Sequence, residues 1–109
     1  MRALNRKQAI AELQAWSAVN APVRVVVRFG AIDADIQARI TSVTDRWVRL
    51  TVGTSAGDLA FQLAEDCVFG VRRPQERKGE HQRFRLGITV ATPAKRGQPP
   101  TAVTLWWLP

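Results

Sequence analysis

Three residues near the middle of the chain have side chains that suit an anionic, aromatic ligand. Arg46, Trp47 and Arg49 lie close together in the sequence. An arginine binds phosphate through a planar fork of donors, and a tryptophan ring stacks on flat groups such as nucleobases. If Val48 faces the interior, Trp47 and Arg49 face outward, because side chains alternate along a strand. Gln62 is a secondary candidate for this surface, and the competing interpretation is that Trp47 covers a rim or a subunit contact.

The densest positive charge lies in the second half of the chain. It comprises Arg72, Arg73, Arg77, Lys78, Arg83 and Arg85, followed by Lys95 and Arg96. The whole chain has a net charge of +7, from 16 basic and 9 acidic residues. A basic patch of this kind suits a polyanion, and such binding depends steeply on salt concentration. The alternative is a loop and a strand face that are simply solvated.

Two adjacent tryptophans, Trp106 and Trp107, stand near the C-terminal end of the sequence. Neighbouring residues on a strand point to opposite faces, so both rings cannot point inward. An exposed tryptophan is typical of an interface, which predicts an oligomer contact at this pair. Packing against an N-terminal helix, with Trp16, is the other interpretation.

Two carboxylates share the outward face of one predicted strand. Asp33 and Asp35 are close enough together for acid–base chemistry or a metal, but no third ligand stands nearby. Arg24, Arg28 or Arg39 can reach them from neighbouring strands. We therefore expect ordinary cross-strand ion pairs.

The remaining reactive side chains form no catalytic group. The single histidine, His81, lies in a charged loop, and the single cysteine, Cys67, falls on a buried position of its strand. The sequence thus predicts a binding protein with no catalytic residues, no metal site and no cofactor. One cysteine, no apolar run long enough to cross a membrane and no apolar leader at the start favour a cytoplasmic protein.

The elements that must position these residues are mostly strands. Apolar and polar residues alternate without a break from Ile32 to Thr41, and a period of two indicates a strand with one buried face. The phase slips between Ile40 and Val43, which predicts a bulge or a sharp bend. Asn5 and Gln8 predict a capping box at the start of an amphipathic helix.

These patterns predict a mostly β protein with a single domain over residues 1–109. A helix occupies residues 5–20, a small, strongly bent five-stranded antiparallel barrel occupies residues 22–73, and a β-hairpin is appended over residues 82–109. The predicted barrel is of the SH3-like kind.

Two segments resemble a known family. Phe29-Gly30 at the first turn and the run Ile40-Thr41-Ser42-Val43-Thr44-Asp45-Arg46-Trp47-Val48-Arg49-Leu50 are similar to the first motif of the Sm/LSm family, which includes the bacterial Hfq branch. The resemblance implies a homo-oligomeric ring, a hexamer or heptamer, that binds single-stranded RNA. It also implies that Arg46 and Trp47 line the pore and that Arg49 and Gln62 contact RNA beside them.

Two functions therefore follow from the sequence. The first is a non-enzymatic Sm-like ring that binds single-stranded RNA or another polyanion, without a membrane. The alternative is a protein–protein interaction or scaffold module without a nucleic-acid role, in which the Trp106 and Trp107 hairpin docks a partner.

Overall fold

The computed structural model describes residues 2–53, 57–73, 86–94, 97 and 100–107. Within them the chain forms one helix and eight strands. The elements are β1 (Arg2–Leu4), α1 (Arg6–Ala18), β2 (Pro22–Phe29), β3 (Ile32–Val43), β4 (Trp47–Val52), β5 (Gly57–Gln62), β6 (Val68–Arg72), β7 (Gly87–Thr92) and β8 (Thr101–Trp107).

The strands form a single antiparallel sheet in the order β1-β6-β7-β8-β2-β3-β4-β5. The prediction of a mostly β protein with an N-terminal helix and an antiparallel sheet is confirmed. The prediction of a five-stranded barrel is wrong, because eight strands form an unclosed sheet whose edges are β1 and β5. The C-terminal hairpin is not an appendage either: β7 and β8 lie between β6 and β2, in the middle of the sheet.

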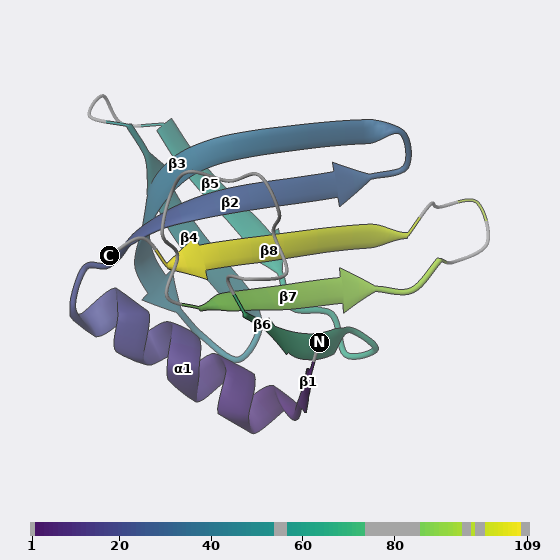
Figure 1. Ribbon diagram of the computed structural model, residues 1–109, viewed down its shortest axis with the longest axis horizontal. Coiled ribbons are helices and arrows are strands. Elements are labelled where there is room, and N and C mark those ends of the chain that lie inside the picture. The colour runs from purple at the N-terminus through teal and green to yellow at the C-terminus, as the bar shows by residue number, and fades with distance from the viewer. Residues whose placement is uncertain (1, 54–56, 74–85, 95–96, 98–99, 108–109) are drawn as a thin grey trace.

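The sheet bends so strongly that its two halves enclose a core. Figure 1 shows β2, β8 and β7 running side by side, with β4 and β5 crossing behind them and α1 along one end. Alternation explains the interior: Val23 and Val25 on β2, and Val103 and Leu105 on β8, are buried on one face. The buried residues of α1 and of both halves of the sheet form one cluster.

The helix α1 begins at the predicted capping box. The Asn5 side chain accepts a hydrogen bond from the Gln8 backbone N–H, and the Gln8 side chain accepts one from the Asn5 N–H. The helix buries Ala9, Leu13 and Trp16 and contacts β3 and β6. It therefore covers an opening that the bent sheet leaves over its core.

The long strand β3 carries the bend. Its register against β4 shifts between Ile40 and Ser42, which confirms the predicted irregularity at this position. An irregularity of this kind increases the local twist of a strand. In Figure 1 β3 curves from the β2 side of the sheet to the β4 side, and so it places the β4–β5 hairpin across the core.

Candidate functional site

The structure brings together the four residues singled out around Trp47, and we call Arg46, Trp47, Arg49 and Gln62 the Trp47 surface. Val48 on β4 is buried, whereas Trp47 and Arg49 on either side of it are exposed. Trp47 is opposite Gln62 on β5, so the two side chains share a face. The Trp47 side chain is 40% exposed. The outward orientation of Trp47 and Arg49 that the sequence predicted is thus present.

The turn before β4 holds Trp47 in place. The Thr44 hydroxyl oxygen accepts hydrogen bonds from the backbone N–H groups of Arg46 and Trp47, at 3.2 and 3.0 Å. The Thr44 N–H donates to the Trp47 carbonyl at 2.9 Å. A threonine that closes a turn on its own backbone pre-organises the residues that follow it. Trp47 therefore starts from a fixed backbone position.

Beside the Trp47 surface lies β5, the longer of the two sheet edges. Five of its six residues are exposed, and Leu59 is 39% exposed although it is apolar. The Leu63 N–H donates to the Arg46 carbonyl, so the pair 63/46 is a hydrogen-bonded pair. Because such pairs alternate along an antiparallel ladder, the backbone groups of Asp58, Ala60 and Gln62 point away from β4. They face the free edge.

A residue not singled out from the sequence, Arg6, fastens this region to the helix. Its guanidinium donates to the carbonyls of Asp45 and Ala64, each at 2.8 Å, and to that of Leu63. It also lies over the Phe69 ring, 5.8 Å from the centroid. One side chain thus ties the β3–β4 turn, the end of β5 and the β5–β6 connection together.

The helix pattern contains the signal for Arg6. It stands three residues before Ala9 and seven before Leu13, so it lies on the buried face of α1. An arginine in that position must extend to partners at the margin of the core, because a buried guanidinium without acceptors is costly. Arg6 also lines a hollow of about 540 Å³, together with Arg46, Gln62 and Glu65 among others.

Cys67 is buried, as the sequence predicted. Burial raises the pKa of its thiol, although the Arg6 guanidinium, which donates to the sulfur at 3.6 Å, acts in the opposite direction. A thiol with a raised pKa is protonated at neutral pH and is a poor nucleophile. Cys67 therefore belongs to the core.

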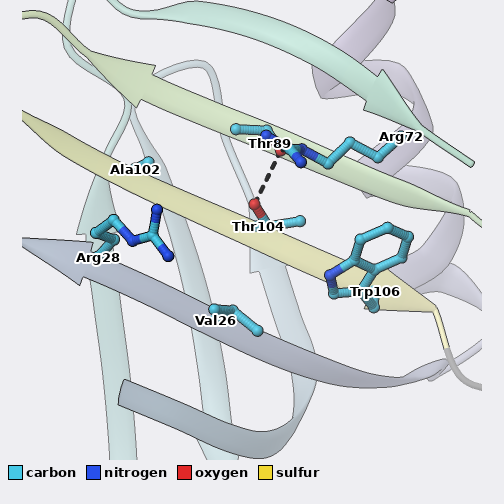
Figure 2. A pocket seen from close by; sticks show the side chains of 7 residues that line it. All are labelled: Val26, Arg28, Arg72, Thr89, Ala102, Thr104 and Trp106. Carbon is cyan, nitrogen blue, oxygen red and sulfur yellow. Dashed lines mark hydrogen bonds between the residues drawn. The ribbon is translucent and has the colours of Figure 1, made fainter. Parts of the chain in front are cut away.

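A second candidate site lies on the outer face of the central strands. Figure 2 shows a pocket lined by Val26, Arg28, Arg72, Thr89, Ala102, Thr104 and Trp106. Its volume is about 250 Å³. These residues come from β2, β6, β7 and β8, so the pocket exists only because the C-terminal hairpin lies in the centre of the sheet. Thr89 is only 4% exposed there.

The two tryptophans of β8 point to opposite faces and both contact their own chain. Trp107 packs on Trp16 of the helix, with ring centroids 5.5 Å apart and planes tilted by 40°. Trp106 is 2% exposed and lies over Gly87, where a Cβ would come within 2.7 Å of the ring. This is the arrangement that the helix-packing interpretation describes for Trp107. An oligomer interface at this pair stays a prediction.

The basic patch is divided by the structure. Arg72 is half-buried in the pocket, where its Nε–H donates to the Thr89 hydroxyl, and Arg73 is exposed. The other members, Arg77, Lys78, Arg83 and Arg85, lie outside the described residues, as do His81, Lys95 and Arg96.

The paired aspartates form the expected ion pairs. Arg24 Nε donates to Asp35 at 2.7 Å, and Arg28 Nε lies 3.1 Å from Asp33. Both pairs span β2 and β3, so the cross-strand interpretation is confirmed. Among the described residues, no group of three histidine, cysteine or acidic residues is placed to hold a metal ion. In that same part of the chain, no helix is both long and apolar enough to span a membrane.

Comparison with known proteins adds one similar structure. No family model and no curated protein sequence matches this chain. The chain is similar to the YcgR-N domain of YcgR from Escherichia coli, with 12% sequence identity and a TM-score of 0.37. The match covers 95% of this chain and 91% of that chain.

The resemblance to the Sm/LSm family is wrong, because the strands do not pair as a five-stranded barrel, and the RNA-binding ring that it implied is wrong with it. A barrel closed over residues 22–73 requires those strands to pair among themselves. Instead β6 pairs with β1 and β7, and β2 pairs with β8. The grouping of Arg46, Trp47, Arg49 and Gln62 stands as geometry, without the pore that was expected around it.

Proposed function

We propose that this chain is a non-enzymatic protein-interaction module that binds an extended, acidic segment of a partner protein along β5. The observation that supports this most is the free edge of β5, exposed over most of its length and adjacent to the Trp47 surface. A sheet edge offers unpaired N–H and C=O groups, and proteins add strands to such edges for recognition. The buried, reduced Cys67 fits a cytoplasmic setting.

The partner's charge follows from the side chains next to the edge. Arg49 is opposite Ala60 on β5, and the alanine side chain ends at Cβ. Neighbouring strands lie about 4.8 Å apart, so the long Arg49 side chain can cross over Ala60 to reach an added strand. Arg46 lies beside Gln62 in the adjoining hollow. Acidic side chains on the added strand would meet these two guanidinium groups.

Trp47 supplies the apolar part of the contact. Its ring is 40% exposed on the same face as Arg49. Leu59, which is opposite the buried Leu50, presents a second apolar side chain at the edge on the other face of β5. Tryptophan and arginine are enriched among the residues that dominate binding energy at protein interfaces. An added strand of about six residues buries less than the ~1,200 Å² of a standard interface, so we expect a transient, micromolar complex.

A second copy of the chain is the competing occupant. The net charge of +7 opposes self-association of an isolated domain, which favours an acidic partner over another copy. Homo-oligomerisation through β5 is therefore an outcome that the experiment must separate from the proposal.

The test is site-specific photocrosslinking in the cell, with p-benzoylphenylalanine placed at Leu59. The matched control places the same group at Phe29, which is also apolar and exposed, at 45%, but stands at the end of β2, an inner strand of the sheet. We expect an adduct from position 59 alone, with the crosslinked peptide of the partner rich in aspartate and glutamate. The adduct should be lost in R49E and W47A.

A proline substitution distinguishes backbone pairing at the β5 edge from nonspecific contact with its surface. A60P removes an N–H that points away from β4, so the sheet keeps its own hydrogen bonds while an added strand loses one. A60V keeps the N–H and is the control. Adducts that persist in A60P, or that arise equally from position 29, would overturn the proposal. An adduct between two copies would replace the acidic partner by a homo-oligomer.

A further inference from the structure

We infer that the pocket on the outer face of β2, β8 and β7 binds the oxyanion group of a small organic acid. The site is separate from β5 and its partner. It is lined by two arginines, two threonine hydroxyls and one wall of Trp106, Val26 and Ala102. Its volume of about 250 Å³ equals about eight water molecules at ~30 Å³ each, which suits a small molecule and not a chain segment.

The polar floor of the pocket is a chain of hydrogen bonds. Arg72 Nε–H donates to Thr89 Oγ1 at 3.0 Å, and Thr89 Oγ1 lies 2.9 Å from Thr104 Oγ1. When Thr89 donates to Thr104, the hydroxyl proton of Thr104 is available for a third acceptor. A positive charge at the head of such a chain strengthens each bond along it. In that direction the chain ends in a polarised donor, the Thr104 hydroxyl, in the pocket lining.

Arg28 approaches this donor from the opposite side. In Figure 2 its guanidinium, on β2, points toward Thr104, and the Arg72 guanidinium, on β6, points toward Thr89. Arg28 is paired with Asp33 through Nε, and both side chains of that pair are largely exposed. Exposed pairs of this kind contribute little, so the outer nitrogens of Arg28 can turn to a ligand at small cost. An anion between them would receive a hydroxyl donor and two cations.

The apolar wall indicates an organic ligand over a bare ion. Trp106 is held rigidly, because its ring lies against the backbone at Gly87 and is 2% exposed. Val26 and Ala102 on the neighbouring strands continue the wall. Pockets for small molecules combine apolar walls with a few placed polar groups, which is the arrangement here.

The experiment is a titration of the ¹⁵N-labelled full chain, followed by two-dimensional NMR. Four probes are compared: inorganic phosphate, phenyl phosphate, acetate and benzoate, each against sodium chloride at equal ionic strength. We expect saturable shifts of the Thr89 and Thr104 amides and of the Trp106 indole. Phenyl phosphate or benzoate should bind more tightly than its bare counterpart. If the two phosphates bind more tightly than the two carboxylates, the oxyanion group of the ligand is a phosphate, and in the opposite case it is a carboxylate.

Variants test the assigned donors. T104V removes the terminal donor with little change in volume and should weaken binding about tenfold or more, and T104S should restore it. R72Q should weaken binding similarly. R24Q is the matched control, because it also removes one arginine charge, from a position on β2 that lies outside the pocket lining.

Three results would overturn the inference. The first is the absence of saturable shifts at Thr89 and Thr104 in a folded protein. The second is an equal loss of binding in R24Q and R72Q, which would reduce the effect to general charge. The third is unchanged binding in T104V.

Discussion

The two edge strands of the sheet, β1 and β5, differ in length and in the protection of their backbone groups. The edge strand β1 has three residues, Arg2 to Leu4, and leads at once into the capped helix α1. The edge strand β5 has six residues, and its only charged side chain is Asp58. Natural sheets protect their edges with short strands, with charges and with proline. One edge of this sheet follows that rule and the other does not, which favours β5 as the edge that receives a partner.

The two edges are also connected. Arg6 stands two residues after β1 and donates to carbonyls at Asp45, Leu63 and Ala64, at the end of the β4–β5 hairpin. The short edge therefore contributes to the rigidity of the long one. An edge that recognises a partner must keep its backbone groups aligned, because ordering them on binding costs free energy.

The largest expected effect is the loss of the Arg6 contacts. R6A removes several charge-assisted hydrogen bonds and should lower the free energy of unfolding by about 3 kcal/mol. Urea denaturation measures this loss. K7A, at the exposed neighbouring position, should change stability by no more than about 0.5 kcal/mol. Amide exchange at residues 61–64 should accelerate in R6A, and unchanged exchange there would show that Arg6 does not clamp the long edge.

Proline placed on each edge strand tests whether β5 alone is needed for partner binding. A60P on β5 should weaken partner binding by at least about tenfold, equal to ~1.4 kcal/mol, while A3P on β1 should change it less than twofold. Crosslinking yield from position 59 measures both. Equal losses from the two substitutions would mean that the edges are equivalent and that the difference in length has no functional meaning.

Substitution of an exposed and of a buried tryptophan distinguishes effects on partner binding from effects on stability. W47A should abolish most partner binding and lower the free energy of unfolding by less than about 1 kcal/mol, because the ring is largely outside the core. W16F, in the core, should lower stability without a comparable effect on binding to the remaining folded protein. Denaturation and crosslinking of both variants provide the check. A large stability loss in W47A would make Trp47 a structural residue.

The smallest expected effect is the pH dependence that Cys67 gives to the free energy of unfolding. Because the pKa of Cys67 is raised in the folded protein, its thiol stays protonated while the unfolded chain ionises. Its contribution to stability is complete below the ordinary value of 9.0 and is lost as the pH rises through that value toward the folded pKa. The free energy of unfolding should fall by no more than about 1.4 kcal/mol per pH unit through this group. Urea denaturation at pH 8 and pH 10 measures it, and C67A should flatten the dependence.

Much of the local structure could be predicted because it depends on near neighbours. Asn5 and Gln8 are three residues apart, and the irregularity at Ile40 shows as a phase slip within one strand. The ion pair of Arg28 and Asp33 spans one tight hairpin. The pocket was missed because Arg28, Arg72 and Thr104 come from three different strands that lie far apart in the sequence.

The amino-acid sequence by itself determined the strands that follow the helix, the faces of the residues on them, the start of the helix and the exposure of Trp47. Each of these depends on periodicity or on contacts within a few residues. The short strand β1, which pairs with β6, was not predicted. Only the tertiary structure decided the order of the strands, which left β5 as an edge, brought β7 and β8 to the centre and placed Arg6 against residues 57 to 61 positions away. A period of two reveals which face of a strand is buried and is silent on which strand lies beside it. The choice of neighbours is made by long-range contacts in the shared core, and with it the position of every candidate site on this protein.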